Sequence, residues 1–306
     1  MTEWAATDRP VVIVVGDAGV DVLAKHDAPI APGDDRSASV RIELGGAAAN
    51  TAAWLAHSGA EPVLVGRVGD DPTGRQVRAE LTEAGVRCAL AVDADAHTCC
   101  VVVLVDGLGQ RSMLPDRGAS ARLRPGDLPP ELLAEARHLH LSGYVLLDQR
   151  SAATGVAMLR AARAAGLSTS VDPQSAALLT DRDAFLAAVH GVDLLLPNTA
   201  ELAALTGSTD PDSARALLDV VGAVAVTSGD AGADWLDRTG RRTVAALAAD
   251  CVDSTGAGDA FDAALLAAWL TGSGPVAALR AGVAAGATVV GRLGAHPSSG
   301  QPSITG

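Results

Sequence analysis

Short apolar runs recur along the chain and are separated by longer stretches with helical spacing. The runs are β-branched or rich in leucine, and Gly, Pro or Asp lies at their ends. They occupy residues 10–15, 62–66, 138–141, 167–171, 192–196 and 223–227. Because strands that are covered on both faces form continuous apolar runs, we expect these segments to be buried strands.

Helical patterns fill the intervals between these runs. They cover residues 47–57, 73–84, 151–165 and 199–205, and end at Gly59, Gly85, Gly166 and Gly207. A glycine just past a helix end accommodates the positive φ that is common there. Strands that alternate with helices predict an α/β fold in three layers, α/β/α, around a mostly parallel central sheet.

Two segments break this alternation and predict a small second sheet. Residues 17–44 have no clear helical pattern, and residues 98–105 and 111–114 resemble a hairpin around Asp106 and Gly107. We expect a lid made of segments at about 17–44 and 97–118. Because the sequence has neither a repeat nor a long linker, it predicts a single domain over residues 1–306.

Composition and charge narrow the possible partners. The net charge is −13, arginines are scattered, and Lys25 is the one lysine in the chain. This balance disfavours binding to nucleic acid, and it excludes a phosphate loop of the GxxxxGK[ST] type. Any phosphate site must therefore use backbone N–H groups, a metal ion or arginine.

The cysteines and the apolar segments bear on location. Cys88, Cys99, Cys100 and Cys251 lack metal-binding spacing, so we expect buried thiols in a reducing compartment. The first residues show no leader pattern, and no apolar run reaches the roughly 18 residues of a membrane span. We expect a cytoplasmic protein without membrane contact.

The stretch DSTGAGDAF at 253–261 combines glycines, an acid and the start of an apolar helix. Gly256 and Gly258 let backbone N–H groups converge at the positive end of the helix dipole, which favours an anion. Asp259 beside a bound phosphate is costly unless it accepts a proton. By itself, the GAGD segment is better explained as a glycine-rich turn whose acid favours the helix dipole.

Three further motifs change that balance. GGAAAN at 45–50 opens a predicted helix, while PNTAE at 197–201 and TSGDAG at 227–232 follow predicted strands. Ligands of open α/β sheets bind at the carboxyl ends of the strands. Together, the four motifs indicate a ligand site more strongly than a series of turns.

With these motifs the chain resembles the ribokinase-like (PfkB) family of carbohydrate kinases. The resemblance extends from GDAGVD at 16–21 to GAHPS at 294–298, and DSTGAGDAF is its most specific motif. It implies a ribokinase-like fold and transfer of the γ-phosphate of ATP to a hydroxymethyl group of a small sugar or sugar acid. It also implies that Asp259 is the general base and that Gly256, Ala257 and Gly258 form an anion hole.

The resemblance assigns further residues to ATP and Mg²⁺. Asn198 and Glu201 match an NxxE element, in which Glu201 would act on Mg²⁺ through water; alternatively, Glu201 only favours the helix dipole. Thr227, Gly229 and Gly232 match a loop that approaches the nucleotide.

The acceptor pocket is implied in the same way. Asp21 would hold substrate hydroxyls, because one carboxylate can accept two hydrogen bonds from a vicinal diol. Further positions that match the pocket are Gly45, Gly46, Asn50 and, less specifically, Asp17. Arg117 either meets an acidic or phosphorylated substrate or is an ordinary lid arginine.

A site for a monovalent cation is also implied. Asp253, Thr255, Gly294 and Ser298 match a loop that holds such an ion beside the anion hole in ribokinase-like proteins. Activation by K⁺ is therefore a hypothesis.

The substrate stays open. Gly19 replaces an asparagine of ribokinase that contacts ribose, and Ala48 replaces a glycine of the second motif. Alternatives to a sugar kinase are a nucleoside or pseudouridine kinase on the same fold, and a catalytically silent sugar-binding protein. We also expect a homodimer formed through the lid, because pairing between subunits would cover the lid's edges.

Overall fold

A nine-stranded sheet forms the centre of the protein in the computed structural model, which describes residues 9–27, 30–33, 35–107, 111–291 and 294–297. Its strand order is β13-β12-β11-β10-β9-β8-β1-β4-β5. The strands are β1 (Val11–Val15), β4 (Glu61–Gly69), β5 (Arg87–Asp93), β8 (His138–Ser142), β9 (Ser168–Asp172), β10 (Leu194–Leu195), β11 (Ala223–Thr227), β12 (Ala233–Asp237) and β13 (Gly240–Val244). All pairs from β11 to β5 are parallel, whereas β12 and β13 are antiparallel to their neighbours.

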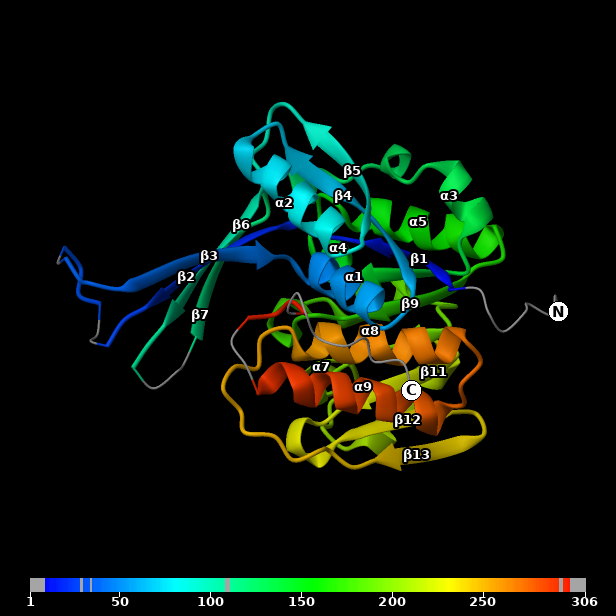
Figure 1. Ribbon diagram of the computed structural model, residues 1–306. Helices are drawn as coiled ribbons and strands as arrows, with labels where there is room; N and C mark the ends of the chain where they lie inside the picture. Colours follow the sequence, from blue (N-terminus) through cyan, green and yellow to red (C-terminus); the bar gives the residue numbers. More distant parts are fainter. Residues whose placement is uncertain (1–8, 28–29, 34, 108–110, 292–293, 298–306) are drawn as a thin grey trace.

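Helices cover both faces of this sheet (Figure 1). One face packs against α1 (Ala47–His57), α2 (Pro72–Glu83), α8 (Ala257–Leu270) and α9 (Pro275–Val290). The other packs against α3 (Pro130–Glu135), α4 (Tyr144–Leu147), α5 (Ala152–Ala164), α6 (Arg182–Ala188) and α7 (Thr199–Thr206). Short 3₁₀ helices are η1 (Gly118–Arg122), η2 (Pro125–Asp127), η3 (Ala176–Leu178), η4 (Pro211–Asp219) and η5 (Gly229–Ala231).

Strand β1 shows why the apolar runs are continuous. Val12 and Val14 belong to the core under α1 and α8, whereas Ile13 and Val15 belong to the opposite core. Successive side chains of a strand point to opposite faces, so a strand between two helix layers needs an apolar residue at every position. The predicted three-layer α/β/α architecture is therefore confirmed.

A four-stranded sheet projects from this body and forms the lid (Figure 1). Its order is β3-β2-β6-β7, with β2 (Gly19–Lys25), β3 (Ser39–Gly45), β6 (Cys99–Val105) and β7 (Arg111–Asp116). The predicted hairpin is present, since β6 and β7 are antiparallel. The two lid segments join through β2 and β6, which are parallel.

The structure also differs from the sequence-based expectations. The run at 192–196 is a strand only over Leu194–Leu195. The elements β5, β12, β13, α3, α4, α6 and α9 were not predicted. Strand β13, at one edge of the large sheet, has no buried residue and contains two arginines, so it lacks an apolar run. Strand β5, at the other edge, contains the short apolar run CALAV at 88–92, which was not assigned to a strand. Four buried thiols were expected, but only Cys99 is buried, whereas Cys88 and Cys100 are half-buried and Cys251 is exposed.

No helix in the described part of the chain combines the length and the apolar character needed to cross a membrane.

Candidate active site

Two adjoining cavities lie where the strands of the large sheet end and α8 begins. The smaller, of about 180 Å³, is lined by Asp172, Gln174, Leu196, Asn198, Glu201, Thr227, Gly256, Gly258, Asp259 and Asp262. The larger, of about 540 Å³, shares Asn198, Thr227 and Gly258 with it. The structure therefore brings the motifs at 197–201, 227–232 and 253–261 to one place.

The first turn of α8 presents backbone donors to the smaller cavity. Gly256 has φ of 76°, and a Cβ at this position would lie 2.6 Å from the Cβ of Ala295, so only glycine fits. Ala257 N donates to Ser254 O at 3.3 Å. Among the described contacts, the N–H groups of Gly256 and Gly258 have no acceptor, and such groups at a helix start can bind an anion.

Asp259 lies in the same turn and is 8% exposed. Burial raises its pKa to about 6, although hydrogen bonds from Asn50, Gln174 and Thr51 act in the opposite direction. Asn50 Nδ2 donates to Asp259 Oδ2 at 2.8 Å, which connects α1 to α8. At neutral pH the carboxylate is ionised, yet its pKa is high enough for it to accept a proton.

Asp21 faces this carboxylate from lid strand β2. Burial, followed by the negative charges of Asp259 and Glu43, raises the pKa of Asp21 to about 6. Its carboxylate lies against Gly45, where an added Cβ would be 2.3 Å from Asp21 Oδ1. The predicted acceptor residues Asp21, Gly45 and Asn50 thus lie around Asp259.

Gly46 connects the lid to α1. It has φ of 97°, and a Cβ there would lie 2.5 Å from the carbonyl oxygen of Asp17. A side chain at this position would therefore push the end of β3 away from the end of β1.

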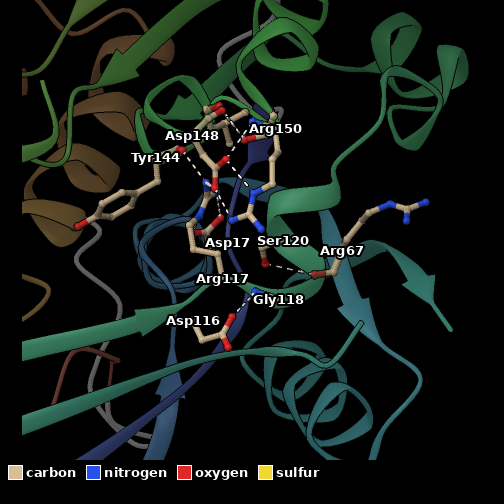
Figure 2. A network of polar contacts seen from close by, with 11 residues as sticks. Asp17, Arg67, Asp116, Arg117, Gly118, Ser120, Tyr144, Asp148 and Arg150 are labelled. Atoms are coloured by element: carbon tan, nitrogen blue, oxygen red, sulfur yellow. Dashed lines mark hydrogen bonds and ion pairs between the residues drawn. The ribbon is translucent and has the colours of Figure 1, made fainter. Parts of the chain in front are cut away.

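Arg117 and Asp17 are bound to each other at the base of the lid (Figure 2). Arg117 Nε and Nη2 donate to the two carboxylate oxygens of Asp17 at 3.0 and 2.6 Å. Arg117 Nη1 donates to Tyr144 O at 2.9 Å and lies 3.0 Å from Asp148 Oδ2. Arg150 also pairs with Asp148, so two guanidinium groups and two carboxylates neutralise one another.

Asn198 and Glu201 form a reciprocal cap at the start of α7. Asn198 Oδ1 accepts from Ala200 N and Glu201 N, and Glu201 Oε2 accepts from Asn198 N at 2.9 Å. Glu201 is 3% exposed, and burial raises its pKa to about 7. This burial is more than a helix cap requires, because a capping acid is normally solvated.

Asp172 and Asp262 line the same cavity and were missed by the sequence analysis. Burial, together with the charges of neighbouring acids, holds the pKa of each well above its usual range. Two signals point to these residues. Asp172 follows the predicted strand at 167–171, and Asp262 lies three residues after Asp259 on the same helix.

The larger cavity contains the predicted nucleotide loop. Thr227, Gly229 and Gly232 line it, and Gly232 has φ of 101° with Val244 O so close that a Cβ would lie 2.1 Å away. The apolar part of its remaining wall includes Ala246, Leu247, Ala249, Phe261, Val283, Ala287 and Val290. A flat apolar group would fit this wall.

Three of the four predicted cation-site residues lie together. Asp253 is 4% exposed; its Oδ1 accepts from Thr255 N at 2.7 Å, and its Oδ2 accepts from Gly294 N at 3.3 Å. Ser298 lies outside the described residues. Trp54 Nε1 donates to Ala295 O at 2.7 Å and fixes this loop against α1.

Comparisons with known proteins agree on the class of activity. A model of the pfkB family carbohydrate kinases matches residues 10–302. The chain is 34% identical over 287 residues to an ATP-dependent ribose-1-phosphate kinase of Halopiger xanaduensis, and the match covers 93% of each chain. It is 35% identical to a fructokinase of Klebsiella pneumoniae over 83% of this chain and 82% of the fructokinase.

A solved structure agrees with these matches. The adenosine kinase from Sinorhizobium meliloti superposes on the chain with a TM-score of 0.86 and 25% identity, over 95% of this chain and 96% of that one. The names of these similar proteins share the word kinase and differ in the acceptor.

Proposed function

The chain belongs to the pfkB family of carbohydrate kinases, and from this premise we propose that it transfers the γ-phosphate of ATP to a hydroxymethyl group of a small sugar. Membership makes it a phosphotransferase with an alcohol group as acceptor. The observation that best supports the specific proposal is the position of Asp259. Its carboxylate is buried in the smaller cavity, next to Gly258, which lines both cavities and whose backbone N–H has no acceptor among the described contacts.

In this reaction Asp259 takes the proton from the attacking hydroxyl. Asn50 holds the carboxylate in place, so the base does not have to be reoriented when the acceptor binds. The N–H groups of Gly256 and Gly258 would donate hydrogen bonds to the transferred phosphoryl group and so stabilise the negative charge that develops on it. Closure of the lid would exclude water and thereby suppress hydrolysis of ATP.

The residues of the smaller cavity fit a hydrated Mg²⁺ ion. Mg²⁺ binds oxygen ligands and retains several waters. Asp172, Glu201 and Asp262 supply carboxylate oxygens, and Asp262 Oδ2 is buried without a described hydrogen-bond partner. No three acidic, His or Cys side chains among the described residues converge on one metal position, so we assign Glu201 a role through water. When bound, Mg²⁺ would neutralise charge on the phosphates.

The larger cavity is the proposed site of ATP. Asn198, Thr227, Gly229 and Gly232 would lie along the phosphates and ribose, and Val283 would contact the adenine without a hydrogen bond. The K⁺ hypothesis for Asp253, Thr255 and Gly294 is kept as a proposal. Equal activity in K⁺ and in a bulky organic cation would contradict it.

Besides small sugars, the acceptor classes to be tested are sugar acids and nucleosides. Relatives with these names include a ribose-1-phosphate kinase, a fructokinase and an adenosine kinase. ADP release assayed over a panel of sugars and nucleosides would separate them. Turnover of nucleosides alone would replace the sugar-kinase proposal with the nucleoside alternative.

A catalytically silent sugar-binding protein is the alternative that the Asp259→Asn variant addresses. We predict that kcat falls by about 10²- to 10⁴-fold, because the proton acceptor is lost while the shape of the side chain is retained. The dissociation constants for ATP and acceptor, measured by calorimetry, should stay within a few-fold. Asp219→Asn, a change of an exposed acid on η4, is the matched control and should leave kcat unchanged.

Near-normal turnover in Asp259→Asn would contradict the general-base assignment. Wild-type protein that binds sugar but releases no ADP with any acceptor would favour the silent alternative.

A further inference from the structure

Two acids are directly opposite each other on adjacent strands of the lid. In the antiparallel pair of β2 and β3, Asp21 lies opposite Glu43. Directly opposite residues project from the same face of a sheet, and like charges in such a pair are destabilising. Folding alone therefore gives no reason for this pair.

Both carboxylates are directed from the lid toward the body. Asp21 lies close enough to Asp259 for the charge of Asp259 to affect its titration. The carboxylate of Glu43 reaches the loop at 294–297, because a Cβ on Gly294 would lie 3.3 Å from Glu43 Oε2. Asp21 and Glu43 on the lid thus lie on the side that faces Asp259 of α8 and the loop at 294–297.

No described cation compensates the pair. Within the described residues, neither Asp21 nor Glu43 forms an ion pair, and Arg41, on the same face of β3 as Glu43, is exposed and forms none with it. Arg117 is already bound by Asp17 and Asp148, and its side chain is 12% exposed. An anionic substrate would consequently meet repulsion, with no free guanidinium among the described residues to offset it.

An independent feature indicates that a hydrogen-bond donor is missing from this pocket. Asn50 is 5% exposed and donates through Nδ2 to Asp259 Oδ2. Its Oδ1 is buried and accepts no hydrogen bond from any described residue. A buried acceptor without a donor costs free energy, which a hydroxyl of a bound substrate would recover.

We infer that Glu43 is a second acceptor residue of the substrate pocket, and that Glu43 and Asp21 together select an uncharged, polyhydroxylated substrate over a phosphorylated or carboxylated one. This inference rests on the proposed kinase function. Hydroxyl groups would donate to Asp21, Glu43 and Asn50 Oδ1, and so separate the facing carboxylates by hydrogen bonds. Glu43 determines specificity in this scheme and takes no part in proton transfer.

The test is the Glu43→Gln variant in the full-length protein. The amide keeps the size of the side chain but loses the charged acceptor, so the KM for an uncharged acceptor should rise about 10- to 100-fold. The KM for ATP and kcat should stay within about threefold. The melting temperature should not fall, since the change removes repulsion, whereas loss of a structural contact would lower it.

A control and a second panel complete the experiment. Glu83→Gln, a change of an exposed acid at the end of α2, should leave all constants unchanged. Wild-type protein should turn over free ribose, fructose or adenosine with a higher kcat/KM than ribose-1-phosphate or gluconate. In Glu43→Gln, the ratio of kcat/KM for the uncharged acceptors to kcat/KM for the anionic ones should fall by at least about tenfold.

An unchanged acceptor KM in Glu43→Gln, or a wild-type preference for ribose-1-phosphate or gluconate, would overturn the inference. Failure of the kinase proposal gives a different result, namely no ADP release with any acceptor. In that case calorimetry decides: weaker binding of uncharged sugar by Glu43→Gln supports the role of Glu43, and equal binding overturns it.

Discussion

At Gly45, the absence of one methyl group determines where Asp21 can lie. An alanine Cβ would be 2.3 Å from Asp21 Oδ1, well inside the contact distance, so the carboxylate would have to move. We predict that Gly45→Ala raises the acceptor KM about 10-fold or more and changes the KM for ATP little, because a displacement near 1 Å can cost about 10²-fold. Steady-state kinetics with both substrates varied would measure this.

Gly126→Ala is the matched control for that variant, because no atom lies within 4 Å of its added Cβ. Equal effects of the two alanine variants would contradict the proposed contact.

His140, on the central strand β8, gives the stability a specific pH dependence. It is fully buried, and burial lowers its pKa from 6.5 to about 4. Between these pH values the unfolded chain binds a proton at this residue and the folded chain does not. Its contribution to stability is therefore lost as pH falls from 6.5 towards 4.

We predict that His140→Leu reduces this loss. The difference in unfolding free energy between wild type and variant should shrink by up to about 3 kcal/mol from pH 7 to pH 4, at 1.36 kcal/mol per pKa unit. Urea titrations at several pH values would measure it. The buried carboxylates have raised pKa values and act in the opposite direction, but they are common to both proteins and cancel in the difference.

Leu139→Val, which changes the neighbouring residue on the other face of β8, should give a difference that does not vary with pH. A similarly constant difference for His140→Leu would contradict the prediction.

How well individual residues could be predicted depended on the range of the interaction. Gly256, Gly258 and Asp259 lie within the first turn of α8, so their spacing along the chain was enough to indicate an anion site with an acid beside it. Glu43 gains its proposed role from the register of β2 and β3, which pairs it with a residue 22 positions away. That register is set by the packing of the lid, and the sequence shows no motif at Glu43.

At the scale of elements, Arg117 joins the end of β7 to the segments that follow β1 and α4 (Figure 2). Removing the guanidinium would leave Asp17, which is 6% exposed, as an uncompensated buried charge. We predict that Arg117→Met destabilises the protein by about 3–5 kcal/mol in chemical denaturation. Arg150→Met, which removes an exposed partner of Asp148, should cost less than about 1 kcal/mol.

Adding Asp17→Asn to Arg117→Met should restore much of the loss, because the stranded charge is then absent. A double variant as unstable as the sum of the single variants would show that packing, and not charge, causes the effect.

The elements also differed in how clearly the sequence indicated them. Strands between two helix layers, such as β1 and β11, are continuously apolar, β11 up to its last residue Thr227, and were predicted. In an edge strand such as β13, exposed and half-buried positions alternate and some residues are charged. The strand therefore has no continuous apolar run. The pairing of β2 with β6 joins segments that are distant in sequence, and local patterns contain no information about it.

At the scale of the whole molecule, the lid has an exposed apolar face. One row of apolar side chains crosses all four strands on the face opposite to Asp21 and Glu43. Each residue of the row is the strand-pairing partner of the next, in the order Ile42, Val22, Val102 and Leu114. Ile42 is 63% and Leu114 is 60% exposed. Contiguous apolar surface of this kind favours association, so we keep the homodimer through the lid as a proposal.

We predict that wild-type protein is a dimer in light scattering and that Ile42→Lys combined with Leu114→Lys makes it monomeric, because burying the added charges is unfavourable. Val92→Lys, at a 55% exposed apolar residue of the body strand β5, should not change the mass. A monomeric wild type, or a dimer that survives the double change, would contradict the proposal.

The division between lid and body has a consequence for inheritance. The lid strands and the residues at their base come from positions 16–50 and 97–118, whereas the residues assigned to phosphate, metal and nucleotide come from positions after 170. Mutations in the part of the gene that encodes positions 16–118 would therefore alter which molecule is phosphorylated, while the part that encodes positions after 170 preserves how it is phosphorylated. Recombination between the two parts would exchange acceptor preference as a block.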